Sequence, residues 1–400
     1  MKVLCSTQMG TGTIMGQTMR VVAIAKELQH RGHDIKFLAG DKLISVIRGY
    51  GLEVIEFKDM PQIEAFTDEF REGKTNQEEK MKKIKEVIDK IKTKEVEVGK
   101  TESPDIMLCG TITGVQAAQI LGIPSVLTCL QPHGEKTLAM FSKGVSDNSS
   151  ITVVFREVLE AADLILLEGI PELGVEAELA KGTEWTSIIK EKVRYTGPLL
   201  LEDPEQLPGQ EELKRKHIGE SHSKMVYVTI GGGSKLIGEE FLKLVLETFQ
   251  LMPTVKAVIS TGLGLSSEEF SSYNPPAHVS IFNFVPGTEM IRASDVTVFH
   301  GGSSTLMNCL ACGKPAVVIP SMGEQEDNGA VLSKHGAGIV LEKATLTPVI
   351  LAQAIEKILS SPTYQAKAEN LRDLCRVYGG AGAAASMIED LIPKREVVKS

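Results

Sequence analysis

The chain has 400 residues, 42% of them hydrophobic and 24% charged, and its formal net charge is −9. This length favours two domains over a single core, and the charge argues against a broad nucleic-acid or anionic-lipid surface, though not against a local anion pocket. No stretch reaches about 18 consecutive apolar residues and the amino end does not resemble a secretion signal, so we expect a cytoplasmic protein without an integral membrane segment.

Short apolar runs alternate with stretches of helical spacing in the first half of the chain. The runs predict strands at residues 3–5, 35–38, 54–57, 106–109, 125–128 and 164–167. Residues 74–100 are rich in Lys and Glu, and Met81, Ile84, Ile88 and Ile91 recur there at helical spacing. This pattern favours an amphipathic helix with a solvated charged face, although a mobile flap over a ligand pocket is an alternative.

A segment rich in Pro, Gly and acidic residues follows Tyr195 and predicts a linker. Beyond it the alternation restarts, with strands expected at residues 226–230, 255–260, 279–282, 296–299, 316–319 and 338–341. Strands that alternate with helices form parallel sheets covered by helices on both faces. We therefore expect an α/β fold of two doubly wound, Rossmann-like domains facing a central cleft, with boundaries at 1–200, a linker at 201–215, and 216–380.

Three glycine-rich turns each follow a predicted strand, at residues 10–18, 231–235 and 300–305. Glycine lets backbone N–H groups approach a ligand, and the helix that follows begins with unpaired N–H donors and a partial positive charge. Two such turns in the second half indicate a diphosphate site. Neither G-x-x-x-x-G-K-[ST] nor G-x-G-x-x-G is present, and no D-x-D suggests a metal ion on the diphosphate. Helix ends, backbone amides and His300 would then neutralise its charge.

The six cysteines are scattered along the chain, as is typical of reduced thiols. Cys309 and Cys312 form a single C-x-x-C inside a predicted helix. Since a zinc site usually needs four ligands, this pair favours core packing over a metal or redox role.

Several motifs of the second half recur together in one known family. They are His300-Gly301-Gly302, Gly313-Lys314-Pro315, Glu324-Gln325 and Gly336-Ala337-Gly338, with Thr305, Pro320 and Asn328 between them. With the stretch "GTGTIMGQTMRVVAIAKELQHRGHDIKFLAG" near the amino end, they resemble the nucleotide-sugar glycosyltransferases of the GT-B fold, and especially the bacterial antibiotic and macrolide glycosyltransferases. The resemblance implies an acceptor-binding first domain, a donor-binding second domain, and a final helix at 381–400 that packs back on the first domain.

The resemblance also implies a donor site in which the sugar nucleotide is a substrate and no cofactor is needed. His300 would hydrogen-bond the diphosphate, and the backbone around Phe284 and Val285 would contact the base. Glu324 and Gln325 would bind sugar hydroxyls, because a carboxylate and an amide together accept and donate as a vicinal diol requires. The other residues expected at the diphosphate are Gly231, Gly232, Gly233, Ser234, Gly301, Gly302, Ser303, Ser304 and Thr305.

Three positions depart from the family pattern. Relatives carry a catalytic histidine in the first loop, but Gln17 stands at that position here, and an amide cannot take up a proton near pH 7. The aspartate that orients that histidine should follow the strand at 106–109, where Gly110 and Thr111 stand instead. Asn308 replaces a glutamate that grips the ribose in relatives, which leaves room for dTDP beside UDP as the donor nucleotide.

The resemblance thus predicts a metal-independent, inverting hexosyltransferase, and it leaves open how a small acceptor is activated. An acidic acceptor, such as a carboxylate, a phosphate or an acidic phenol, would need no strong base. Alternatively, His133 would act as a substitute base. A non-catalytic helper that binds a nucleotide or a partner enzyme is a further interpretation, and sugar-nucleotide epimerisation is a weaker one. The many aliphatic residues at 43–196 are also compatible with a lipophilic acceptor, and nothing in the sequence indicates the oligomeric state.

Overall fold

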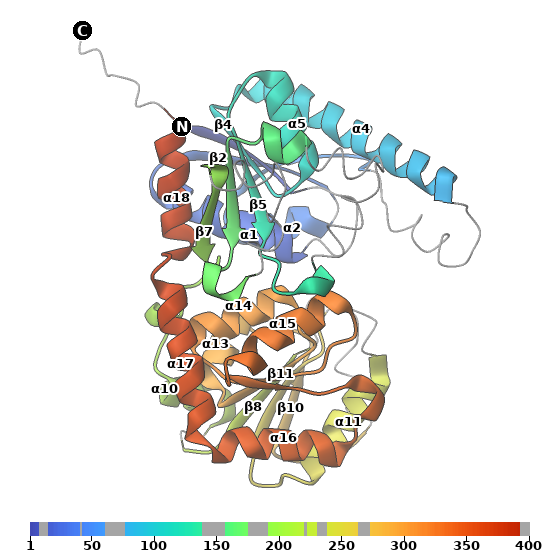
Figure 1. Cartoon of the computed structure of the whole chain (residues 1–400), viewed down its shortest axis with the longest axis vertical. Helices are drawn as coiled ribbons and strands as arrows, with labels where there is room; N and C mark the ends of the chain where they lie inside the picture. Colours follow the sequence, from blue (N-terminus) through green and yellow to red (C-terminus); the bar gives the residue numbers. More distant parts are fainter. Residues whose placement is uncertain are drawn as a thin grey trace.

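The computed structural model describes residues 1–7, 15–40, 42–60, 77–137, 157–174, 191–219, 222–229, 238–262 and 273–392. These residues form two parallel sheets, one from each half of the chain, with helices on both faces (Figure 1). This architecture confirms the predicted α/β fold with two parallel-sheet domains.

The first sheet has seven strands in the order β3-β2-β1-β4-β5-β6-β7. The chain starts in its middle, runs outward through β2 and β3, and returns to β4 beside β1. The strands are β1 (Lys2–Ser6), β2 (Asp34–Ala39), β3 (Glu53–Glu56), β4 (Ile106–Cys109), β5 (Ser125–Leu130), β6 (Leu164–Glu168) and β7 (Val193–Gly197).

Alternate residues of β1 enter the two cores on either side of this sheet. Val3 and Cys5 pack with α1 (Met15–His30) and α2 (Lys42–Gly49), whereas Leu4 packs with α4 (Gln77–Glu102) and α5 (Ile112–Leu121). This follows from the two-residue period of a strand, which turns successive side chains to opposite faces. Helix α4 lies where the sequence predicted an amphipathic helix, and its amino-terminal end extends beyond the rest of the first half (Figure 1).

The second sheet has six strands in the order β10-β9-β8-β11-β12-β13 and repeats the same winding. Its strands are β8 (Met225–Thr229), β9 (Lys256–Ser260), β10 (Val279–Phe282), β11 (Val296–Phe299), β12 (Ala316–Val318) and β13 (Gly338–Val340). One core lies against α11 (Gly238–Gln250) and α16 (Pro348–Ser360). The other lies against α13 (Gly287–Ala293), α14 (Ser303–Cys312) and α17 (Pro362–Arg376), and it buries both Cys309 and Cys312.

Two features near the middle of the chain differ from the sequence prediction. Strand β7 was not predicted, because its sequence VRYTG contains only one strongly apolar residue and runs into the segment predicted as a linker. The predicted linker at 201–215 contains a short 3₁₀ helix, Pro204–Gln206, and most of α10 (Gln210–Ile218). The acidic residues Glu211 and Glu212 lie in the first turn of α10, where they favour a helix by complementing its dipole.

Helix α18 (Gly380–Leu391) belongs to the first half in space although it closes the chain (Figure 1). Ala384, Ala385 and Ile388 are buried with the residues of β1 and α1. Arg31, directly after α1, bonds Glu389, with 2.8 Å between Nη1 and Oε2. The break between α17 and α18 falls at Gly379, whose φ of 76° is readily adopted by glycine.

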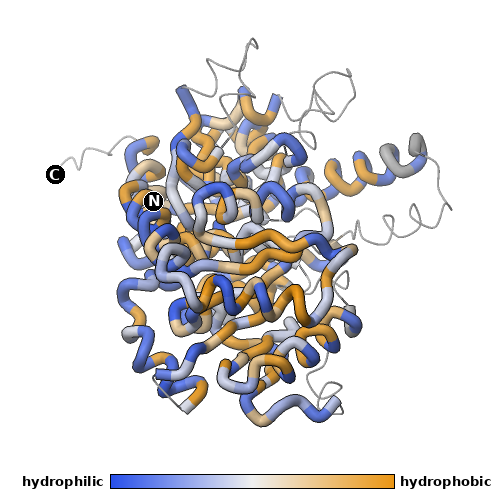
Figure 2. Tube along the Cα trace, turned by 60° about the horizontal axis from the view of Figure 1, so that its bottom comes forward, coloured by the Kyte–Doolittle hydropathy of each residue, from blue (hydrophilic) through white to orange (hydrophobic). Residues whose placement is uncertain are grey.

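Apolar residues gather along the strands and on the inward sides of the helices, and hydrophilic residues on the outer turns (Figure 2). Within the described part of the chain, no helix combines the length and the apolar character that crossing a membrane requires.

Candidate functional site

The winding of each sheet marks one place for a ligand. In a doubly wound sheet, ligands bind at the carboxyl ends of the strands where the chain reverses its direction of progress across the sheet. That point lies between β1 and β4 in the first sheet and between β8 and β11 in the second. Ser6 and Cys109 end the first pair of strands, and Thr229 and Phe299 end the second.

The turn after β11 is built around His300, Gly301 and Gly302. Helix α14 begins at Ser303, Gly302 is its N-cap without a side-chain cap, and the first helical bond runs from Leu306 N to Gly302 O (3.0 Å). The N–H groups of the first turn therefore have no partner within the helix. Ser303, Ser304 and Thr305 form this first turn, and backbone N–H groups at such a helix start are suited to an anion.

This turn packs directly against the start of α15 (Gly323–Lys334). Gly301 has a φ of 89°, and a Cβ added to it would lie 2.5 Å from the carbonyl oxygen of Gln325. Asn328 also donates from Nδ2 to Gly301 O at 2.8 Å. The two sequence motifs, His300-Gly301-Gly302 and Glu324-Gln325, are thereby brought into one place.

His300 is mostly buried, and its Nδ1 has no hydrogen-bond partner among the described residues. Burial lowers the pKa of this imidazole to about 4, so the ring is neutral near pH 7. We expected His300 to help neutralise the charge of a diphosphate; a neutral ring would do so by donating a hydrogen bond and not by positive charge. A Cβ on Gly302 would lie 2.7 Å from His300 Nε2, so glycine is needed there to leave room for the ring.

Glu324 and Gln325 lie in the first turn of α15. Burial raises the pKa of Glu324, and the charge of Arg20 and a hydrogen bond from Asn328 act in the opposite direction. Gln325 accepts from Ser321 N at 2.8 Å through its Oε1. Its amide nitrogen is the part that can meet a ligand, because the oxygen already holds the loop before α15.

The other residues that the sequence predicted for the donor site differ in their exposure and in their hydrogen bonds. Phe284, after the end of β10, is 75% exposed, whereas Val285 packs into the core beneath it. Asn308 accepts from Thr288 Oγ1 at 2.7 Å and donates to Ser304 O at 2.9 Å, so both ends of its amide are already bonded. Gly231, Gly232, Gly233 and Ser234 lie outside the described residues.

His133 lies at the contact between the two halves. Its Nδ1 is 2.8 Å from Asn328 Oδ1, its Nε2 is buried without a partner among the described residues, and burial lowers its pKa. It is therefore a buried side chain rather than an exposed loop histidine. On the first half, Arg20 forms a buried ion pair with Glu168 (Nη1 to Oε2, 3.3 Å), and Arg20 Nε has no partner in the described part of the chain.

The predicted catalytic position, Gln17, lies beside the end of β4. A Cβ added to Gly110 would lie 3.3 Å from Gln17 Cγ. Thr111, where relatives are expected to carry an aspartate, instead lies 3.3 Å (Oγ1 to Oγ) from Ser6. The sequence prediction missed the acid that does reach this point, which is Glu95 of α4, hydrogen-bonded by Ser6 and Thr113.

One feature of the sequence distinguishes Glu95 from the other acidic residues of α4. The buried face of α4 carries Val87, Ile91 and Val98, and Glu95 falls four residues after Ile91 on that same face. An acidic side chain on the apolar stripe of an amphipathic helix is unusual, since it must lose its hydration.

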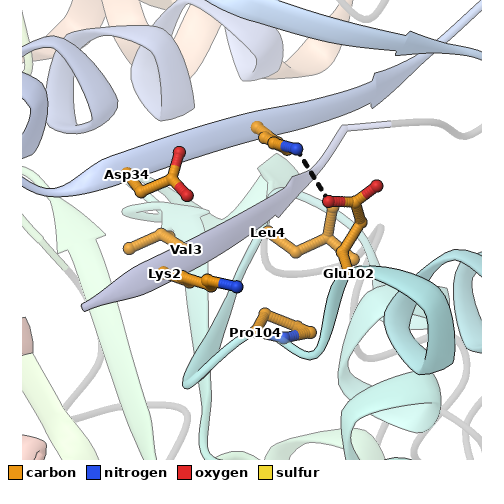
Figure 3. Close-up of a pocket in the computed structure, with 7 residues that line it drawn as sticks. Lys2, Val3, Leu4, Asp34, Glu102 and Pro104 are labelled. Atoms are coloured by element: carbon orange, nitrogen blue, oxygen red, sulfur yellow. Dashed lines mark hydrogen bonds and ion pairs between the residues drawn. The ribbon is translucent and has the colours of Figure 1, made fainter.

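A hollow at the opposite edge of the first sheet is not a competing site. It lies at the amino ends of β1 and β2 and is bordered by Lys2, Asp34, Glu102 and Pro104 (Figure 3). Lys36 there bonds Glu102 (Nζ to Oε2, 2.8 Å), so these two opposite charges already satisfy each other. Among the described residues, moreover, no three His, Cys, Asp or Glu side chains gather as metal ligands would.

Comparison with known proteins agrees with this geometry. Residues 226–377 match the glycosyltransferase family 28 C-terminal domain. An uncharacterised glycosyltransferase of Methanosarcina mazei is 28% identical over 391 residues, covering 94% of this chain and 96% of the relative.

Two solved structures share the fold over nearly the whole chain. The glycosyltransferase of kitacinnamycin has a TM-score of 0.72 at 20% identity, covering 98% of this chain and 99% of the other. The spinosyn rhamnosyltransferase SpnG, complexed with thymidine diphosphate, has a TM-score of 0.69 at 18% identity, covering 97% and 100%. The chain therefore shares its fold with these glycosyltransferases over nearly its whole length, and residues 226–377 match the glycosyltransferase family 28 C-terminal domain.

Proposed function

We propose that the chain transfers a hexose from a nucleoside diphosphate sugar, with dTDP or UDP as the nucleotide, to a small acceptor held on the first half. The observation that carries this proposal is the contact between the turn at His300–Gly302 and the start of α15. It joins two uncapped helix starts, an imidazole with an unpartnered Nδ1, and a Glu-Gln pair in one place.

The chemistry of these groups suits a leaving diphosphate. As the bond from the anomeric carbon to the diphosphate oxygen breaks, negative charge develops on that oxygen. The N–H groups at the start of α14 would stabilise it, and the neutral His300 would add a hydrogen bond. Because these donors are fixed before the reaction, little reorganisation is needed, and we propose that the transfer needs no metal ion.

The sugar and the base would be held by groups on either side of the diphosphate. Glu324 would accept from sugar hydroxyls, since the Arg20 charge opposes its protonation, and the Gln325 amide nitrogen would donate to them. The exposed ring of Phe284 would stack on the base. Thymidine diphosphate in SpnG supports dTDP, and the bonded amide of Asn308 is compatible with a nucleotide that lacks the ribose 2′-hydroxyl.

We further propose that the acceptor attacks from the side of the first sheet, opposite the leaving diphosphate, which inverts the anomeric carbon. Both lipophilic acceptors and acidic acceptors are compatible with this arrangement. The alternative of a non-catalytic helper predicts nucleotide binding without transfer, so one set of measurements separates the two functions.

Thermal melting with dTDP, UDP and GDP, and transfer assays with dTDP-glucose and UDP-glucose, test the proposal. The acceptors would be a panel of phenols, carboxylic acids and alcohols. We expect His300→Ala to reduce turnover on the order of a hundredfold or more, because one stabilising donor is lost. His335→Ala is the matched control, since His335 lies at the far end of α15, about 18 Å along the helix from its start, and its ring bonds Val331 O of the same helix.

Three results would contradict the proposal in different ways. If no nucleotide shifts the melting temperature, the proposed donor site is wrong. If a nucleotide shifts it but no acceptor is glycosylated, the non-catalytic helper is favoured. If His300→Ala and His335→Ala have equal turnover, only the proposed role of His300 is wrong.

A further inference from the structure

Glu95 lies in a buried cluster of hydroxyl groups at the switch point of the first sheet. Its Oε1 accepts from Ser6 Oγ, at the end of β1, and from Thr113 Oγ1 at 3.1 Å. Thr111 Oγ1 closes the cluster, 3.1 Å from Thr113 Oγ1 and 3.3 Å from Ser6 Oγ. All four side chains are at most 2% exposed.

Within the ranges that the structure describes, the cluster lacks the full set of hydrogen-bond partners and the positive charge that would stabilise a buried carboxylate. Glu95 Oε2 is buried without a partner among the described residues, and no basic side chain there offsets the burial. Thr7 Oγ1, one residue beyond Ser6, is likewise buried without a partner in the described part of the chain. Burying an acid in this way is unfavourable because the carboxyl loses its hydration, and a leucine at the same helical position would avoid that loss.

The position of the cluster in the first sheet indicates a function for the buried acid. Ser6 and Thr111 follow β1 and β4, the two strands between which the chain reverses its course across the first sheet. Gln17 of α1 lies against Gly110, next to Thr111. The cluster thus lies under the part of the first half where the proposed acceptor binds, beside Gln17, whose amide cannot take up a proton.

We propose that Glu95 is a positioning residue for the acceptor: its carboxylate orients the Ser6 and Thr111 hydroxyls and receives, through them, the proton that a hydroxyl acceptor loses. This inference rests on the proposed transferase function. In the step, the acceptor oxygen bonds the anomeric carbon as the bond to the diphosphate oxygen breaks. The acceptor proton passes to Thr111 Oγ1, the Thr111 proton passes to Ser6 Oγ, and the Ser6 proton passes to Glu95, so the diphosphate leaves as an anion and Glu95 becomes neutral.

The titration of Glu95 gives this step a pH dependence. Burial raises its pKa to about 8, although the hydrogen bonds from Ser6 and Thr113 lower it. Among the described residues, the titratable thiol of Cys109 on β4 interacts with Glu95, and burial raises the pKa of that thiol well above its ordinary value. Lys94 and Glu97, beside Glu95 on α4, point outward and bond each other. Transfer to a hydroxyl acceptor should therefore increase with pH through about 8.

Glu95→Gln tests the inference because it keeps the shape and removes the basicity. With an alcohol acceptor we expect kcat to fall about 10²- to 10⁴-fold and the rise near pH 8 to disappear. With a carboxylic acid acceptor, which is already ionised, the loss should be small. Glu95→Asp should recover part of the alcohol activity, and Glu97→Gln is the matched control on the exposed face of α4.

The outcomes separate this inference from the proposed function. If wild type transfers to alcohols and Glu95→Gln retains the same rate and pH profile, the inference is overturned. It is also overturned if Glu95→Gln loses alcohol and carboxylate transfer equally while its melting shift with dTDP matches that of wild type, since that would mean a merely structural role. Absence of any transfer by wild type would instead contradict the proposed function.

Discussion

The burial of Glu95 links its ionisation to the stability of the fold, independently of any substrate. Burial raises the pKa of this carboxyl from its ordinary 4.5 to about 8. Between these values the unfolded chain releases a proton that the folded chain retains, so the free energy of unfolding falls as the pH rises. The loss is about 1.4 kcal/mol for each unit of the pKa shift.

We therefore expect wild type to lose stability relative to Glu95→Gln as the pH rises from about 4.5 to about 8. The difference should be constant below and above this range. Chemical denaturation of both proteins across the range measures it, and Glu97→Gln should follow wild type because its side chain is exposed. A difference that does not change with pH would show that Glu95 is not a neutral, buried acid at low pH.

Single residues could be predicted from the sequence where a local motif defines their surroundings. His300, Gly301 and Gly302 follow a strand and precede a helix, and the structure places them in that turn. Glu95 could not be found in this way, because its partner Ser6 is 89 residues away and Thr113 is 18 residues away. The one indication was an acidic residue on the apolar face of a predicted helix. A helical pattern alone does not show which residues pack against that face.

At the scale of elements, the close packing of the turn after β11 on α15 depends on Gly301. Alanine there would be strained at a φ of 89°, and its Cβ would meet the Gln325 carbonyl oxygen at 2.5 Å. The turn or the helix must move to relieve the contact. We expect Gly301→Ala to lower the free energy of unfolding by about 3 kcal/mol or more and to abolish the melting shift with dTDP.

Gly336→Ala separates backbone strain from displacement of the turn. Gly336 also has a positive φ, 71°, but a Cβ there would meet only Lys367 Cγ at an ordinary 3.5 Å. We expect this variant to lose roughly 1–2 kcal/mol and to keep the melting shift with dTDP. Equal dTDP shifts in both variants would mean that the turn does not position the nucleotide.

The strands and helices themselves were largely predictable, for a physical reason. Strands of a parallel sheet covered on both faces, such as β6 with the sequence LILLE, are apolar throughout and stand out from their surroundings. Strand β7 lies at the edge of the first sheet and carries Arg194 and Tyr195, which weaken that signal. Helix α10 was not recognised because of its high content of charged residues, four of which lie in its first and last turns.

At the scale of the whole molecule, the segment after β5 joins the two halves. Three consecutive residues of α15 bond it: Glu326 with Lys136, Asp327 with Thr137, and Asn328 with His133. The sequence could not predict these contacts, since the partners are about 190 residues apart and each pair is chemically ordinary. They matter for function because α15 also carries Glu324 and Gln325 at its start.

The Asp327 contact gives a test of how the halves cooperate. Asp327 Oδ2 accepts from Thr137 N at 2.6 Å and from Thr137 Oγ1 at 2.7 Å, and both side chains are buried. Asp327→Ala would leave the buried Thr137 N–H without its acceptor, which costs about 1–3 kcal/mol. Because the proposed donor groups lie on the second half and the acceptor groups on the first, weakening the contact should separate binding from transfer.

We expect Asp327→Ala to keep its affinity for dTDP, measured by calorimetry, while kcat for transfer falls at least tenfold. The matched control is Glu326→Gln, whose ion pair with Lys136 is exposed on both sides and therefore contributes little. If Asp327→Ala transfers as fast as Glu326→Gln, the contact does not hold the halves in their reacting arrangement. If dTDP affinity falls together with kcat, the donor site extends across the contact, and His133 and Thr137 belong to it.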